Sequence, residues 1–402
     1  MRKHMSRRMA LLGLCTGLTL LAQSAGATAV FAAPKRYARV AAEIDYGPQA
    51  TSYLGFGRKA YAQAVADAKN MAIHINDFLD APSEASLADA RQAWRDARPA
   101  YSRTETLRFV NSPIDQPGSA EIPPGPELRI NAWPVNEAVM DSVRGAPGSG
   151  LIGDSVSLDE ALLIASNQAR DEADVTLGWH AIEFLLWGQD FNAEGPGQRS
   201  YKEFLPGDAQ NDRRRRYLKL VTSILVRDLE SVAEEWSAAG SYSAFIEKEA
   251  PVEVVGRLLH GAASLAAIEL YGERMTVALD SRSQEDEHSC FSDNTLADLS
   301  GNLEGIRWLL MGRYDDQNLG SSVLELVEWR DPTLAGRLLA ALDDASAQLA
   351  KLDQPFDQII LLPDNDPLRA QAERTAESMR QVAVQLKAVA ERLGIDIVVP
   401  GV

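Results

Sequence analysis

The segment 178–190, which reads GWHAIEFLLWGQD, constrains the fold more than any other stretch of this 402-residue chain. It places His180 and Glu183 three residues apart among apolar side chains. On an α-helix, positions i and i+3 share one face, with Cβ atoms about 5–6 Å apart. Burying an imidazole and a carboxylate without partners is costly. We therefore expect this pair to be satisfied by a hydrogen bond, an opposite charge or a metal ion.

The rest of the chain predicts an all-α fold. Apolar residues recur at helical spacing between loops rich in proline and glycine, and almost no run alternates as a strand does. Ser157 and Thr176 are expected as N-caps, and Gly188 is expected to end the helix that carries the pair. The predicted helices span 58–80, 83–110, 134–143, 158–166, 177–187, 208–237, 251–280, 295–311, 331–352 and 366–394.

A short internal repeat predicts how these helices are grouped. Residues 302–312 read NLEGIRWLLMG and align with GWHAIEFLLWG at 178–188, matching its apolar face and final glycine. Glu304 and Arg307 stand in the second copy where the first has His180 and Glu183. We expect two helical-bundle halves related by an internal duplication. Their predicted bounds are 33–240 and 241–402.

The N-terminus resembles an export signal. Residues 1–32 combine a basic start, an apolar stretch and small residues at a cleavage position, which is typical of a signal peptide. The pair Arg7-Arg8 leaves twin-arginine and ordinary secretion both open. We expect cleavage, a periplasmic or otherwise extracytoplasmic location, and no stable membrane insertion.

The charge balance narrows the partners. Cleavage would remove four Lys/Arg residues and no acid, which takes the net charge from −17 to −21. Such a surface disfavours nucleic acid and favours cations. Only Cys290 would remain, so no internal disulfide is expected.

The pair and the acids elsewhere in the chain form a candidate metal site. Imidazole and carboxylate both bind first-row metals, but no second histidine is near in sequence, so the other ligands would be carboxylates. Iron, manganese or calcium would suit such a set at least as well as zinc. Among the acids, Glu105 is the best candidate because of its aromatic surroundings. The alternative is a His–Glu hydrogen bond in a bundle core. The remaining candidate pocket residues are Asp115, Glu137, Asp141 and Asp190.

Several stretches together resemble the imelysin-like family, whose signature is Gly-x-His-x-x-Glu. They are GWHAIEFLLWGQD, AWRDARPAYSRTETLRF with SPID, INAWPVNEAVMD, GPGQRS, GERM, EHSCFSDNT and QPFDQII. The resemblance implies an all-helical protein of two duplicated halves with a functional site around the signature. It implies metal ligands at His180, Glu183 and Glu105. In related iron-uptake domains an acid near INAWP also contributes, and Asn131 holds that place here.

Three functions follow from these observations. The first is an exported protein that binds a divalent metal ion or iron, with zinc as an alternative, and serves bacterial iron acquisition together with an iron-uptake membrane protein. The second is a metal-dependent endopeptidase of the imelysin type. The third is a helical scaffold in which the polar pair is structural. The sequence favours binding over peptidolysis because it offers no obvious general base and no edge strand to hold a peptide.

Overall fold

The structure is a computed structural model that describes residues 44–119, 123–192 and 195–402. In these residues the chain is built from α-helices and one short antiparallel hairpin, β1 (Arg313–Tyr314) with β2 (Gln317–Asn318). The predicted all-α fold is confirmed. The predicted signal peptide, residues 1–32, lies outside the described residues.

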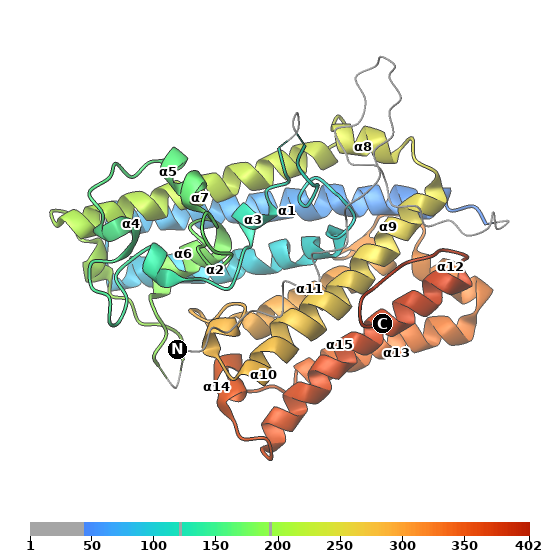
Figure 1. The fold of residues 1–402 in the computed structure, drawn as a ribbon. Coiled ribbons are helices and arrows are strands. Elements are labelled where there is room, and N and C mark those ends of the chain that lie inside the picture. Colours follow the sequence, from blue (N-terminus) through green and yellow to red (C-terminus); the bar gives the residue numbers. More distant parts are fainter. Residues whose placement is uncertain (1–43, 120–122, 193–194) are drawn as a thin grey trace. The chain divides into compact units, whose positions relative to one another are not determined.

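Side-chain caps mark where two of the long helices before residue 246 begin. Ser83 and Ser86 form a capping box that begins α2, and the Asp208 side chain accepts from the N–H groups of Gln210 and Asn211 to begin α7. In Figure 1, α1, α2 and α7 run alongside one another, and α1 packs against both of the others. The α-helices here are α1 (Gly47–Asp80), α2 (Glu84–Thr104), α3 (Glu127–Ile130), α4 (Gly150–Gly153), α5 (Glu160–Ser166), α6 (Gly178–Trp187), α7 (Ala209–Trp236) and α8 (Ser241–Ile246), with 3₁₀-helices η2 (Glu105–Leu107), η3 (Glu137–Val139) and η4 (Tyr201–Phe204).

The later helices form a second group. The helix α15 packs against α13 and α9, and Figure 1 shows these three side by side. The predicted helix 251–280 is unusual, because its second half is a π-helix. The elements are α9 (Pro251–Ser264), the π-helix η5 (Leu265–Val277), α10 (Ala278–Ser281), the 3₁₀-helix η6 (Gln284–Asp286), α11 (Thr295–Leu310), α12 (Val323–Arg330), α13 (Pro332–Leu349), α14 (Phe356–Leu361) and α15 (Pro367–Arg392).

Three local predictions were wrong. The helix expected over 134–143 is only the 3₁₀-turn η3, because the chain bends at residue 134 and no side chain caps the turn. Asp159, not Ser157, caps α5. Thr176 is not the cap of α6, since its hydroxyl donates to the Leu163 carbonyl, and the chain enters the helix through Gly178 instead.

The two groups of helices meet where α11 crosses α2. A side chain at Gly305 would stand 2.5 Å from the carbonyl oxygen of Arg103, so only glycine allows this close approach. The crossing brings Asp298 of α11 within reach of Arg98 of α2. A division of the chain into two duplicated halves at residue 240 stays a prediction. None of the described helices combines the length and apolar character that crossing a membrane requires.

Candidate functional site

The helix α6 holds the predicted pair in the centre of the described fold. All ten of its residues are buried. It begins at Gly178, whose φ of +88° is rare for other residues, and an added Cβ there would lie 2.4 Å from the Ile130 carbonyl oxygen. It ends at Gly188, whose φ is +75°. The glycine of the Gly-x-His-x-x-Glu pattern therefore has a steric reason, because it lets α6 start against the backbone of α3.

His180 and Glu183 are hydrogen-bonded to each other. The Nδ1 atom of His180 lies 2.8 Å from Oε2 of Glu183. The other Glu183 oxygen accepts from the N–H of Ser292 at 3.0 Å and from its hydroxyl at 2.6 Å. Both Glu183 oxygens are thus engaged. In the described part of the chain, the outer nitrogen of His180, Nε2, is buried and has no hydrogen-bond partner.

Burial sets the protonation of this pair. It raises the pKa of Glu183 to about 8, against the opposing hydrogen bonds from Ser292 and the charge of Arg98. Burial, followed by the charge of Arg98, holds the pKa of His180 well below its usual value. Near neutral pH the metal-free pair therefore carries little charge, which is what an apolar interior requires.

We expect Glu183→Gln to change how stability depends on pH. Because the pKa of Glu183 in the folded protein, about 8, lies above its ordinary value of 4.5, its stabilising contribution is full below pH 4.5. That contribution is lost as the pH rises through 8. Glutamine does not titrate. The free energy of unfolding of the variant, relative to that of the metal-free wild type, should increase between pH 5 and pH 8.5.

Urea titrations at several pH values measure this difference, in which the effects of the other groups cancel. Glu373→Gln, at a side chain that is 56% exposed, is the matched control and should change the free energy of unfolding by less than about 1 kcal/mol. A pH-independent difference for Glu183→Gln would show that the Glu183 carboxyl is not buried as described.

A second histidine lies against the first. The rings of His180 and His288 meet edge to face with centroids 4.7 Å apart. Nδ1 of His288 lies 3.2 Å from Oδ2 of Asp298. Burial, then the charge of Arg274, lowers the pKa of His288 to about 3, so this imidazole is neutral.

Asp298 is held as an anion. Arg98 donates from Nε to Oδ1 and from Nη2 to Oδ2, both at 3.0 Å, and Ser289 donates its hydroxyl at 2.6 Å. Burial works against ionisation, but Arg98 and His288 outweigh it and hold the pKa of Asp298 well below its usual value. Asp298 therefore offers a fixed negative charge behind His288.

Glu105, the third predicted ligand, is in the same buried layer but is bound by arginine. Arg274 donates from Nη2 to Oε1 at 2.7 Å and from Nη1 to Oε2 at 3.0 Å. Arg108 and Asn302 donate to it as well. Burial opposes ionisation, yet Arg274 and Arg108 hold the pKa of Glu105 well below its usual value. Both ligand oxygens of Glu105 are occupied in this arrangement.

Asn131 lies between Glu105 and His288. Its amide nitrogen donates to Oε1 of Glu105 at 3.2 Å and lies 3.5 Å from Nε2 of His288. Its oxygen accepts from Arg98 at 2.8 Å and so faces away from the imidazoles. The structure therefore places this residue in the network, as a donor rather than as an available oxygen ligand.

The other predicted pocket residues lie apart from the pair. Asp115 accepts from the backbone of Phe109 and Ser112 and closes its own loop. Asp141 is fixed by Arg214, one of four consecutive arginines, and by Arg199. Glu137 is half-buried on η3, and burial raises its pKa.

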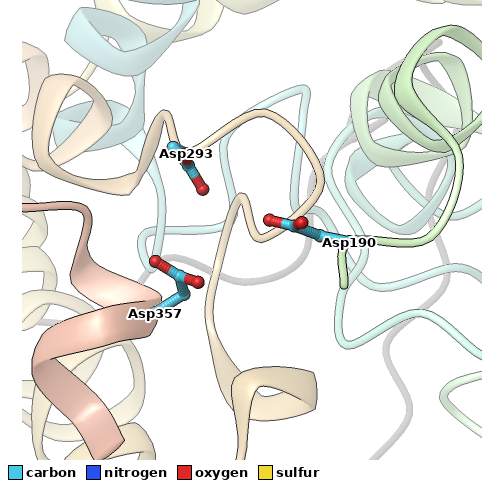
Figure 2. Close-up of side chains that lie close together, drawn as sticks. All are labelled: Asp190, Asp293 and Asp357. Carbon is cyan, nitrogen blue, oxygen red and sulfur yellow. The ribbon is translucent and has the colours of Figure 1, made fainter. Parts of the chain in front are cut away.

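Asp190 joins a different carboxylate cluster. Its oxygens, with those of Asp293 and Asp357, offer atoms that all lie within 4.8 Å of one another, and Figure 2 shows the three side chains converging from separate segments. Burial, and the neighbouring acids after it, raise the pKa of Asp293 to about 7. Burial raises the pKa of Asp190 to about 6. Across the described ranges, this is the set of three such ligand atoms that the fold brings together.

Sequence reasoning missed the residues that surround the pair. Arg98, Arg274, His288, Ser292 and Asp298 come from distant segments, and no local spacing links them to His180. A signal did exist, since His288 and Ser292 belong to the stretch EHSCFSDNT and Arg274 to GERM, both of which carry the family resemblance.

Comparison with known proteins places this fold and site in context. The chain matches the imelysin family profile over residues 57–389. It is 21% identical over 319 residues to iron-regulated protein A of Synechococcus elongatus, a match that covers 76% of this chain and 75% of that protein.

A crystal structure from Parabacteroides distasonis, described as a candidate iron-regulated protein A precursor, superposes with a TM-score of 0.65 at 17% identity. That match covers 89% of this chain and 98% of the other, and at this identity it concerns the fold alone. The family match spans most of the sequence and includes the buried His–Glu pair. The chain is a member of the imelysin family.

Proposed function

We propose that this protein binds a metal ion, with iron as the candidate, at His180, and that it serves iron acquisition outside the cytoplasm. The observation that carries the proposal is the state of His180. One ring nitrogen is fixed by Glu183, and the other is buried without a hydrogen-bond partner among the described residues. A histidine that binds a metal usually donates its second ring N–H to a carboxylate. Binding of an ion at Nε2 would therefore release the proton that Glu183 holds in the metal-free protein.

The residues fit a metal on the imidazole side. The nitrogen Nε2 of His180 is an orphaned buried atom, and such atoms call for an explanation. The carboxylates, in contrast, already have hydrogen-bond partners: Ser292 donates to Glu183, and Arg274 donates to Glu105. We therefore propose that His180 is the ligand and that Glu183 orients it. The predicted ligation by Glu105 would require Arg274 to leave.

The choice of iron rests on the relatives. A protein matching three quarters of this chain is named iron-regulated protein A, and so is the solved structure with the same fold. The acidic composition, with a net charge of −17, suits a protein that meets cations. Export through the predicted signal peptide, and delivery to an iron-uptake membrane protein, are part of the proposal.

A metal-dependent endopeptidase is the second reading of the family. A catalytic metal site keeps an open position for water and needs access for the substrate. His180 is 1% exposed and Glu183 is fully buried. A polypeptide cannot reach this pair without a large rearrangement, so the geometry favours binding over peptidolysis.

Metal analysis tests the proposal. Protein purified without chelator should carry about one equivalent of iron per chain, and His180→Ala should lose it. Glu183→Gln should weaken binding by roughly 10- to 100-fold, as expected for a residue that orients a ligand. His74→Ala, which removes a histidine of α1 outside the network, should bind as the wild type does. Equal metal content in wild type and His180→Ala would contradict the proposal.

A further inference from the structure

Each of the two buried histidines lies beside a carboxylate. His180 has a carboxylate of Glu183 at Nδ1, and His288 has a carboxylate of Asp298 on its own Nδ1 side. Both rings are at most 2% exposed. The nitrogen without a hydrogen-bond partner differs between the two rings in the described chain: it is Nε2 in His180 and Nδ1 in His288. Nε2 of His288 has one contact, with the amide nitrogen of Asn131 at 3.5 Å.

We infer that His288 is a second ligand of the proposed metal ion, so that the ion is held by two neutral imidazoles with Glu183 and Asp298 behind them. The inference rests on the proposed function and names the ligand set of the same site. It replaces the carboxylate-rich set expected from the sequence. His288 lies 108 positions after His180 in the chain, so no local motif joins the two.

The ring geometry agrees with a shared ion. Imidazole nitrogens bound to one zinc-like ion at about 2.0–2.1 Å can lie at most about 4.2 Å apart. The two ring centroids are 4.7 Å apart and the rings meet at 73°. Trp133 packs edge to face against His288 at 5.2 Å and holds the ring from another side. The two rings are therefore close enough for one ion to contact a nitrogen of each.

A single segment, 287–294, builds this arrangement. It carries His288, and it also supplies Ser292, which holds Glu183, and Ser289, which holds Asp298. The segment thus fixes both carboxylates that stand behind the imidazoles.

The same contacts keep oxygen ligands out. Arg98 occupies both oxygens of Asp298, and Arg274 occupies both oxygens of Glu105. The amide oxygen of Asn131 points to Arg98. An ion between the two histidines would meet nitrogen first. Imidazole suits iron, zinc, copper and nickel, whereas calcium and magnesium prefer oxygen.

Metal affinity and spectroscopy test the ligand set together. Iron(II), added without oxygen, should bind His288→Ala and His288→Gln at least about 100-fold more weakly than wild type. Asp298→Asn should lose about 10- to 100-fold. Copper(II), used as a probe, should show electron paramagnetic resonance couplings from two ring nitrogens in wild type and from one in either His288 variant. A large excess of calcium should not displace iron. His74→Ala is the matched control and should leave affinity and spectrum unchanged.

The outcomes separate this inference from the proposed function. Iron bound normally by both His288 variants but lost in His180→Ala would overturn the inference and leave the proposed function standing. Iron retained in His180→Ala would contradict the proposed function itself. If Glu105→Gln loses iron and His288→Gln keeps it, the inference is wrong and the carboxylate ligands expected from the sequence are supported instead. Circular dichroism checks that each variant folds. If a variant does not fold, the copper spectrum of the wild type still gives the number of nitrogen ligands.

Discussion

Arg274→Met is expected to lower the free energy of unfolding by about 3–5 kcal/mol, the usual cost of leaving a buried charge without its partner. The Arg274 and Glu105 side chains are both fully buried, and their two hydrogen bonds join η5 to η2. Removing the guanidinium leaves the Glu105 carboxylate with Arg108, which is shared with Glu127. Burial then disfavours the charged form of Glu105 in the variant.

The pH dependence identifies the cause. In wild type the pKa of Glu105 lies well below its usual value, so its contribution is full above the unfolded-state pKa of about 4.3 and is lost as the pH falls below it. The difference in free energy of unfolding between wild type and Arg274→Met should therefore become smaller as the pH falls from 7 to 3. Urea unfolding at both pH values measures it.

An exposed ion pair provides the control for this result. Arg307 contacts Asp343, whose side chain is 67% exposed, and Arg307→Met should cost less than about 1 kcal/mol at any of these pH values. Equal losses for Arg274→Met and Arg307→Met would mean that the buried ion pair does not form.

Gly178→Ala is expected to lower the free energy of unfolding by about 3 kcal/mol or more. Its φ of +88° strains any residue with a Cβ, by about 1–2 kcal/mol. The new methyl group would also lie 2.4 Å from the Ile130 carbonyl oxygen, and overpacking costs about 1–3 kcal/mol more. Relief of the clash must move α6 away from α3, which shifts His180 relative to Asn131. Thermal or urea unfolding measures the loss.

Gly336→Ala is the matched control, with the opposite sign. Gly336 lies within α13, and an added Cβ there meets nothing within 4 Å. Alanine should stabilise that helix by about 0.5–1 kcal/mol. A Gly178→Ala variant as stable as wild type would contradict the described start of α6.

The fold was largely accessible from the sequence, and the failures have physical reasons. The helix predicted over 208–237 is α7, Ala209–Trp236, because an Asp cap and a long helical period mark it clearly. Gly188 ends α6 as expected. The predicted helix 134–143 fails because a bend at Pro134 decides that segment. The π-helix η5 was not predicted, because the sequence pattern over 251–280 indicates one continuous helix.

The candidate site was accessible only in part. Spacing along α6 predicts that His180 and Glu183 face each other, and the 2.8 Å hydrogen bond follows from that spacing. It cannot predict what faces them. Ser292 lies 109 residues after Glu183, and Arg274 lies 169 residues after Glu105. Partners at such separations are set by how η5 and the segment 287–294 lie against η2 and α6.

The most direct measurement of the central claim is a crystal of iron-loaded protein with anomalous diffraction at the iron edge. The account predicts one strong peak within about 2.0–2.2 Å of Nε2 of His180, on the side that faces His288. A peak among Asp190, Asp293 and Asp357 with none at His180 would contradict it. So would a peak against the oxygens of Glu105 with Arg274 displaced and His288 unbound.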